Sequence, residues 1–200
     1  LGIKTVCYNW MPVFGWFRTR KRNILEGGSI STAFYAKDLD SIADVGNISA
    51  DELWSNLDYF MRKVVPVAEE NGVNLALHPD DPPVDNICGI SRILITPDDM
   101  MRAIDLVPSP NNGIAMCQGT FRTMGADVPA EIRRFGERIH FAHMRDIKGT
   151  PKAFLETFPD NGSTDMTEAM KAYKEIGFKG VIRPDHTPTM YGERNDVPGY

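Results

Sequence analysis

Short apolar runs that end in polar residues recur along the chain and predict buried strands. One run covers residues 74–78 and ends in His78, directly before the irregular segment Pro-Asp-Asp-Pro-Pro. The same pattern returns at residues 113–117, 139–143 and 180–185. Nearly continuous apolar runs of this length are typical of parallel strands that are covered on both faces. Each run is therefore expected to deliver a polar side chain to the loop that follows it.

Segments in which apolar residues recur at helical spacing lie between these runs. The clearest begins with the capping-box pair Ser49 and Glu52 and stops before Gly72, which suits a C-terminal cap. The predicted helices cover residues 50–71, 97–107, 128–135 and 165–176. Further strands are predicted at residues 1–10 and 152–158, and a loop at residues 119–125.

Strands that alternate with helices predict an α/β fold with a parallel sheet, and we expect a (β/α)8 TIM barrel. About five strands are visible, whereas such a barrel needs eight strands and about 250 residues. Both ends of the chain resemble the interior of an element, so residues 1–200 are expected to form a single, partial TIM-barrel domain. Its N-terminal strands and C-terminal helix would then belong to a longer polypeptide. An open, doubly wound sheet is the alternative.

Residues 12–47 follow neither the strand period nor the helix period. This segment mixes aromatic side chains such as Trp16 with a basic cluster that begins at Arg18, and it contains a pair of glycines. Long segments of this kind in a compact domain are usually lids or binding loops. We expect an irregular loop or lid over the top of the barrel, with Trp16 and Arg18 as substrate contacts. A flexible insertion without a function is the alternative.

Composition and charge narrow the classes of partner. The formal net charge of -5 and the pI near 5.4 give no electrostatic basis for binding nucleic acid. No apolar stretch approaches the roughly 20 residues that a membrane helix needs, so no membrane partner is expected. Three cysteines at unrelated spacings form no disulfide framework and suit a reducing compartment. A cytoplasmic protein is expected.

Four strand ends carry side chains that bind metal ions: His78, Cys117, His143 and Asp185. Two imidazoles, a thiolate and a carboxylate are a complete coordination shell for a divalent ion. Tetrahedral Zn²⁺ is the generic choice, with Mn²⁺, Fe²⁺ and Co²⁺ as alternatives. The support for this hypothesis is that each residue ends an apolar run, since any of them alone would more often be a core residue. His140 lies on the opposite face of its strand and is expected to serve packing or to lie at the surface, not to bind the metal.

Several segments resemble the mannonate dehydratase family. The longest are Val-Cys-Tyr-Asn-Trp-Met-Pro-Val-Phe at residues 6–14, Leu-Ala-Leu-His-Pro-Asp-Asp-Pro-Pro at 75–83, and Arg-Arg-Phe-Gly-Glu-Arg-Ile-His-Phe-Ala-His at 133–143. Shorter ones are Arg-Pro-Asp-His at 183–186 and Pro-Gly-Tyr at 198–200. The resemblance implies a TIM barrel related to xylose isomerases and Mn²⁺ (or Fe²⁺) as cofactor. It also implies dehydration of D-mannonate to 2-dehydro-3-deoxy-D-gluconate.

The same resemblance implies roles for individual residues. The metal would be held by His78, Cys117, His143 and Asp185, and the catalytic His and Tyr would fall on His186 and Tyr200. Which of the two takes a proton and which protonates the leaving hydroxyl stays open. The alternatives are a His186 that only orients Asp185 and a Tyr200 without a role.

Substrate contacts are expected from four residues: Arg145, Arg183, Asp80 and Arg18. A guanidinium matches a carboxylate in bidentate fashion, so Arg145 and Arg183 suit the acid group of a sugar acid. Asp80 and Asp81 would bind substrate hydroxyl groups or hold the metal ligands from outside; as the alternative, they form a solvated turn pair before Pro82 without a function. The expected partners are a small-molecule sugar acid and further copies of the chain in a homo-oligomer.

Two other functions compete with a dehydratase. A sugar isomerase or epimerase of the same barrel group also holds a divalent ion at strand ends, but commonly with Glu, Asp and His, so that Cys117 speaks against it. A catalytically idle sugar-acid binding protein would keep the site without using its acid and base.

Overall fold

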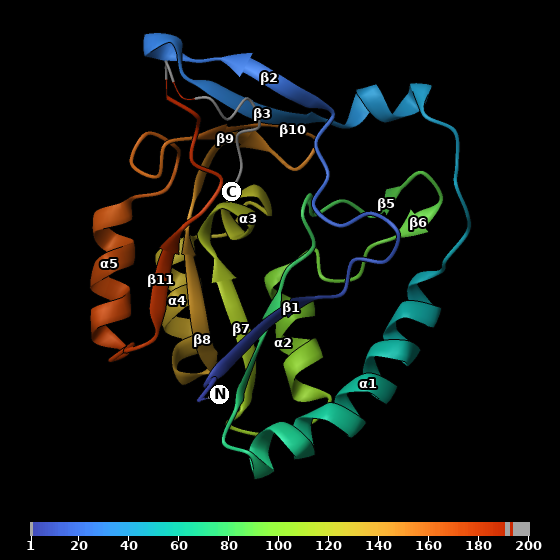
Figure 1. Cartoon of the computed structure of the whole chain (residues 1–200), viewed down its shortest axis with the longest axis vertical. Coiled ribbons are helices and arrows are strands. Elements are labelled where there is room, and N and C mark those ends of the chain that lie inside the picture. Colours follow the sequence, from blue (N-terminus) through green and yellow to red (C-terminus); the bar gives the residue numbers. More distant parts are fainter. Residues whose placement is uncertain (1, 191–192, 194–200) are drawn as a thin grey trace.

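A curled sheet of five parallel strands forms the centre of the computed structural model, which describes residues 2–190 and 193 (Figure 1). The strands follow the order β1, β4, β7, β8 and β11, and each is parallel to its neighbours. Their bounds are β1 Thr5–Asn9, β4 Asn74–His78, β7 Asn112–Cys117, β8 Ile139–Met144 and β11 Val181–Pro184. The predicted α/β class is confirmed, as half of a barrel.

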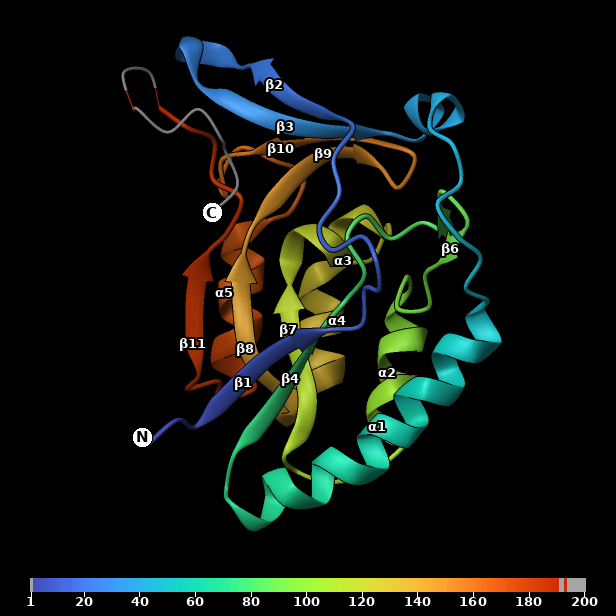
Figure 2. The same cartoon turned by 45° about the vertical axis from the view of Figure 1, so that its right-hand side comes forward.

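Helices cover one face of this sheet in both views (Figures 1 and 2). They are α1 Ala50–Glu70, α2 Pro97–Asp105, α4 Val128–Phe135 and α5 Met166–Glu175. Each begins at a side-chain cap, and the Ser49 hydroxyl accepts a hydrogen bond from the Glu52 amide as the sequence pattern predicted. Among the described residues, no helix combines the length and apolar character that a membrane crossing needs.

The main core lies between the helices and the sheet. Leu57, Met61 and Val65 of α1 are fully buried against Leu77 of β4 and Met116 of β7. The central strand β7 is buried along its whole length, whereas the edge strands β1 and β11 are largely exposed. Burial of one apolar stripe per helix therefore explains why the local patterns predicted these elements well.

The expectation that residues 12–47 are irregular is wrong. This segment contains strands β2 (Arg20–Ile24) and β3 (Ile30–Tyr35), which pair antiparallel around the short 3₁₀ helix η1 (Glu26–Gly28). A second 3₁₀ helix, η2 (Ala36–Ser41), follows. The strand pattern was hidden because β2 reads Arg-Lys-Arg-Asn-Ile, an exposed sequence of charged residues that suits an edge strand.

These strands join β9 and β10 in a second, antiparallel sheet of four strands with the order β2, β3, β10 and β9. β10 (Ala153–Thr157) was predicted, but β9 (Asp146–Thr150) was not. Phe34, Ile147 and Phe154 form the small core of this sheet. Both views place it across the C-terminal ends of the parallel strands (Figures 1 and 2).

A few short elements complete the fold. The predicted loop at residues 119–125 is wrong over residues 119–123, because a short helix, α3 (Gln118–Thr123), begins directly after β7. The 3₁₀ helix η3 (Gly136–Arg138) precedes β8. A hairpin of two short strands, β5 (Asn86–Ile87) and β6 (Ile90–Ser91), follows β4. The strand predicted at residues 1–10 is shorter in the structure, where β1 runs only from Thr5 to Asn9.

Candidate metal centre

Three side chains meet where β4, β7 and β8 end. His78, Cys117 and His143 each offer one ligand atom, and these three atoms all lie within 4.8 Å of one another. Strand register explains the meeting, because Cys117 is the direct partner of His143 on β8 and the carboxyl ends of parallel strands share one edge. The two imidazole centroids are 5.1 Å apart. Three of the four predicted metal ligands are thus brought together.

Asp185, the fourth predicted ligand, lies beside this cluster and outside the 4.8 Å group. It follows β11, and its backbone amide donates to the carbonyl of Met144 at 3.2 Å. Its Oδ2 is 3.4 Å from Nδ1 of His143. The other carboxylate oxygen pairs with Arg183, whose side chain is 52% exposed. The structure therefore brings Asp185 to the rim of the cluster, with Arg183 on its outer side.

Electrostatics favour a metal-binding form of the thiol. Cys117 is fully buried, which opposes ionisation, but Arg145 and the imidazoles of His78 and His143 outweigh burial and hold the pKa of Cys117 well below its usual range. Burial also opposes a charge on His78, yet the neighbouring Cys117 raises the pKa of His78 to about 8. Both shifts favour the thiolate, the form in which a cysteine binds a metal ion.

The donor set fits a divalent cation. A Cys117 thiolate and the Asp185 carboxylate together carry two negative charges, which one divalent ion balances. Nδ1 of His143 is buried and has no hydrogen-bond partner among the described residues. A neutral imidazole nitrogen that makes no hydrogen bond can bind a metal ion, and the Asp185 carboxylate lies 3.4 Å from this one. The residues present can therefore hold a divalent metal ion.

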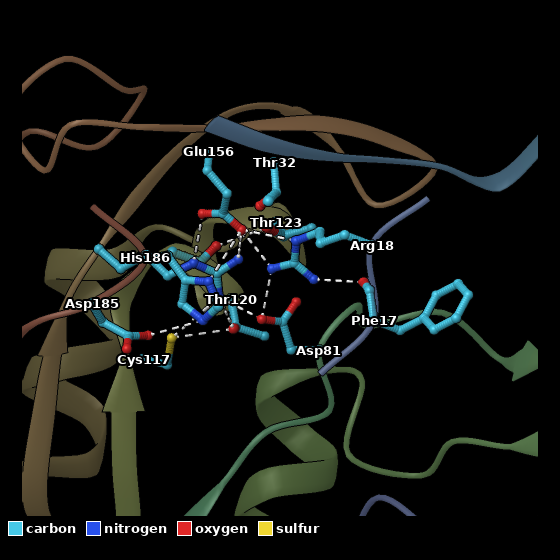
Figure 3. Close-up of polar contacts among 12 residues, drawn as sticks. Phe17, Arg18, Thr32, Asp81, Cys117, Thr120, Thr123, Glu156, Asp185 and His186 are labelled. Carbon is cyan, nitrogen blue, oxygen red and sulfur yellow. Dashed lines mark hydrogen bonds and ion pairs between the residues drawn. The ribbon is translucent and has the colours of Figure 1, made fainter. Parts of the chain in front are cut away.

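Next to the cluster lies a buried network of charges that sequence reasoning did not predict. Figure 3 shows Arg18, Asp81 and Glu156 pointing toward one another beside Cys117. Asp81 follows β4 and Glu156 lies on β10, and the network is completed by Arg145, which lies between β8 and β9. Glu156 shares its strand face with Phe154, so a buried position in the alternating pattern was the available signal.

Three of the predicted substrate contacts are bound to other protein groups. Arg18 and Arg145 are fully enclosed in the charge network. Asp80 accepts hydrogen bonds from the backbone amides of Ile93 at 2.9 Å and Leu94 at 2.8 Å. Through these hydrogen bonds Asp80 holds the segment before α2 in place. Arg183 remains the half-exposed candidate for a carboxylate clamp.

His186 lies between the cluster and the antiparallel sheet. Its backbone φ is 52°, and Trp16 stacks on its ring with centroids 5.0 Å apart. Nε2 is 3.3 Å from Oδ2 of Asp185, and Nδ1 is 4.0 Å from Oε1 of Glu156. Burial and then the nearby Arg145 hold the pKa of His186 well below its usual range, so the ring is neutral. Tyr200, the other predicted catalytic residue, lies outside the described residues.

His140, the fourth histidine, contacts backbone carbonyl groups and not the cluster. Nδ1 of His140 lies 2.8 Å from the carbonyl of Leu75, and Nε2 lies 3.0 Å from the carbonyl of Pro110. It contacts the chain at the opposite ends of the parallel strands from the cluster. The expectation that His140 serves packing is confirmed.

Comparison with known proteins gives one consistent family. A sequence profile of the D-mannonate dehydratase (UxuA) family matches residues 1–46 and 40–200. Mannonate dehydratase 2 of Halalkalibacterium halodurans is 40% identical over 231 residues, covering 100% of this chain and 66% of the relative. The mannonate dehydratase of Oceanobacillus iheyensis is 38% identical over 221 residues, covering 96% of this chain and 63% of the relative. The chain thus spans about two thirds of the length of these curated relatives.

Solved structures agree with this. The crystal structure of mannonate dehydratase from Streptococcus suis serotype 2 superposes with a TM-score of 0.91 at 37% identity, covering 100% of this chain and 62% of that one. A D-tagatose 3-epimerase-like protein superposes with a TM-score of 0.55 at 22% identity, covering 80% of this chain and 60% of the other. The second likeness concerns the fold alone.

Proposed function

The chain belongs to the D-mannonate dehydratase family, and we propose that the protein dehydrates D-mannonate to 2-dehydro-3-deoxy-D-gluconate. The observation that carries the proposal is the cluster of His78, Cys117 and His143 at the ends of three parallel strands. A family relationship alone would also allow an inactive relative, whereas a buried cysteine between two imidazoles supports a protein that uses a metal ion.

The proposed cofactor is Mn²⁺ or Fe²⁺, held by His78, Cys117, His143 and Asp185. When bound, a divalent ion supplies positive charge for the substrate oxygens on which negative charge develops, and it orients the substrate. For the whole protein we propose a complete (β/α)8 barrel, in which the parallel half described above is completed by further strands. A cytoplasmic location and a homo-oligomeric assembly remain predictions from the sequence.

The chain's own residues must move two protons. Dehydration removes the proton at C2 of the sugar acid, and the electrons of that bond form a C2–C3 double bond as the protonated hydroxyl group at C3 leaves as water. The resulting enol then tautomerises to the 2-keto acid. We assign the first task to His186, because a neutral imidazole can accept a proton. Tyr200 is the proposed acid for the leaving hydroxyl. Trp16 covers the ring of His186 and keeps water from that side.

Recognition of the acid group is assigned to Arg183. Its half-exposed guanidinium lies next to Asp185 at the open side of the site, where a substrate carboxylate can reach it. Arg18, Arg145 and Asp80 have buried partners instead. We therefore propose that these three shape the site rather than contact the substrate.

The test is a product assay with the full-length protein. The protein is incubated with Mn²⁺ and D-mannonate, and the mixture is analysed by mass spectrometry and for a 2-keto-3-deoxy acid. Loss of one water with formation of the keto acid supports a dehydratase. An isomerised sugar acid of unchanged mass would instead indicate an isomerase or epimerase. Thermal stabilisation without any product would indicate a binding protein, and either result would overturn the proposal.

A further inference from the structure

Four buried charges connect the antiparallel sheet to the end of the parallel sheet. Asp81 follows the parallel strand β4, and Glu156 belongs to the antiparallel strand β10. Arg18 lies just before β2, and Arg145 lies between β8 and β9. The side chains of all four are at most 2% exposed. The contact between the two sheets is thus ionic where it lies next to the metal centre.

The geometry holds Arg145 in one orientation. Its Nε donates to Oε2 of Glu156 at 2.9 Å and its Nη2 to Oε1 at 2.6 Å, a bidentate pair. Its Nη1 donates to Oδ2 of Asp81 at 2.8 Å. Arg18 holds the same two carboxylates from the other side, at 2.8 Å from Asp81 and 2.5 Å from Glu156. Gly119 packs directly against the Arg145 side chain, since a Cβ at Gly119 would lie 2.6 Å from Cγ of Arg145.

The same guanidinium group reaches the predicted metal ligand. Nη1 of Arg145 donates to Oγ1 of Thr120 at 2.8 Å and lies 3.5 Å from Sγ of Cys117. The Thr120 hydroxyl in turn donates to Sγ of Cys117 at 3.2 Å. A single chain of contacts therefore runs from Glu156 through Arg145 and Thr120 to the sulfur atom.

Stability alone does not account for this arrangement. The two arginines and two carboxylates cancel in charge, and replacing such a buried set by apolar residues is often neutral or stabilising. Groups around a metal ligand fix its orientation and tune its donor strength. In this structure, two hydrogen-bond donors converge on one sulfur atom and are themselves fixed by buried partners. This arrangement is expected of groups that hold the Cys117 sulfur in one position for metal binding.

We propose that Arg145 is a positioning residue for Cys117, and that Glu156 and Asp81 hold it in that role. The proposal rests on the proposed metal-dependent function. The antiparallel sheet then contributes to the metal centre, because β10 supplies the Glu156 carboxylate that orients Arg145. Thr120 passes the constraint on by binding both Arg145 and the sulfur atom.

The test uses Co²⁺, whose bond to a thiolate gives a charge-transfer absorption band in the near ultraviolet. Full-length protein is freed of metal and titrated with Co²⁺, and the affinity and the position of the band are recorded. Arg145→Lys keeps the charge but loses the bidentate fork, and Glu156→Gln removes the carboxylate that holds it. We expect each variant to bind Co²⁺ about 10- to 100-fold more weakly than the wild type. We also expect the band to move to longer wavelength, because the sulfur loses hydrogen bonds.

Thr120→Val is the decisive variant if Glu156→Gln does not fold. It retains the shape and every charge and removes only the hydroxyl group that donates to Sγ. The expected result is a band shifted in the same direction, with a smaller loss of affinity. A purely structural role for the network would lower the thermal midpoint and leave the band in place.

Glu175→Gln is the matched control. Glu175 also forms a bidentate pair with an arginine, Arg133, but on the exposed surface between α4 and α5. It is expected to leave both the affinity and the band unchanged. The proposal is overturned if Arg145→Lys and Thr120→Val bind Co²⁺ with the wild-type affinity and band.

The assay separates this inference from the proposed function. If wild-type protein shows the cobalt–thiolate band but makes no keto acid from D-mannonate, the dehydratase proposal fails and the positioning role of Arg145 can still be scored. If wild-type protein shows no cobalt–thiolate band, Cys117 is not a ligand, and the positioning role falls with it.

Discussion

The two sheets of this protein contribute to the same site in different ways. The parallel sheet delivers His78, Cys117 and His143 from successive strand ends, so its contribution follows from local sequence. The antiparallel sheet delivers Glu156, which contacts Arg18 and Arg145. Its contribution depends on contacts between residues far apart in the chain. Ligand atoms thus come from local patterns, whereas Glu156 reaches the charge network through long-range strand pairing.

The difference bears on how each region tolerates change. Removing a ligand eliminates chemistry that nothing else in the site supplies. Removing a member of the charge network leaves buried partners without neutralisation, and this costs stability as well as geometry. The two regions should therefore give different signatures: loss of the metal when a ligand is removed, and loss of stability together with weaker metal binding when a member of the charge network is removed.

The largest expected effect is loss of the metal. Cys117→Ala and His143→Ala each remove one member of a three-residue cluster, and we expect neither protein to retain metal after purification and dialysis. Elemental analysis measures this directly. Cys7→Ala is the control, because Cys7 is exposed on β1 and is not one of the three clustered residues. Stoichiometric metal in Cys117→Ala would remove that residue from the coordination shell.

A smaller effect is expected at the proposed base. His186→Asn should keep the metal and lower kcat for D-mannonate by about 10²- to 10⁴-fold, the usual contribution of a positioned acid or base. Tyr200→Phe should behave in the same way. Metal content and steady-state kinetics on the same preparations check both.

His140→Gln is the matched control for His186→Asn. Its imidazole contacts two backbone carbonyls at the far ends of the strands. We expect about 1–3 kcal/mol less stability and unchanged turnover per folded molecule. A loss of turnover in His140→Gln as large as in His186→Asn would show that kcat here reports folding rather than chemistry.

The sequence predicted the region whose structure is encoded locally. The helix over residues 128–135 agrees with the structure at both ends, because an N-cap Asp127, a proline at its start and a terminal Gly136 mark it. The strand ending in His78 was found from its apolar run and the prolines after it. Strand ends in a parallel sheet converge, so the metal cluster could be inferred without knowing any distance.

The antiparallel sheet could not be predicted in this way. Strand β2 is short, charged and exposed, and β3 pairs with β10 more than a hundred residues later in the chain. Glu156 is one of 27 acidic residues. Its place on the face of Phe154 in the alternating strand indicates a buried position, but nothing in its local sequence shows that two arginines neutralise it. For the same reason the sequence alone suggests substrate contacts for Arg18 and Arg145, whereas the structure pairs both with buried carboxylates.

Arg18→Met tests the stability of the junction between the sheets. It leaves two buried carboxylates with one arginine, and we expect the free energy of unfolding to fall by about 3–5 kcal/mol. Chemical denaturation measures this. Arg20→Met is the control, since Arg20 pairs with Asp38 at the surface with its side chain 47% exposed. Equal effects of the two substitutions would mean that the network adds nothing beyond a surface pair.

The pH dependence of stability gives the same junction a second test. Burial opposes ionisation of Asp81, but Arg145 and Arg18 overcome it and hold the pKa of that carboxyl below its usual range. Such a carboxyl stabilises the fold above its unfolded pKa of about 3.9, and this stabilisation is lost as the pH falls. Wild-type protein should therefore lose stability below about pH 4 more steeply than Arg18→Met.

The smallest expected effect lies in the parallel half, at the start of α2. Thr96 and Asp99 form a reciprocal capping box, with the Thr96 hydroxyl accepting from the Asp99 amide at 3.1 Å and the Asp99 carboxylate accepting from the Thr96 amide at 3.1 Å. Thr96→Ala should cost about 1 kcal/mol of unfolding free energy, and Thr96→Ser close to nothing. Metal content should be unchanged in both, because the cap stabilises only local backbone. If Thr96→Ala lowered the free energy of unfolding as much as Arg18→Met, the distinction between local and long-range contributions would be contradicted. A contact within four neighbouring residues would then stabilise the protein as much as an ion pair that joins the two sheets.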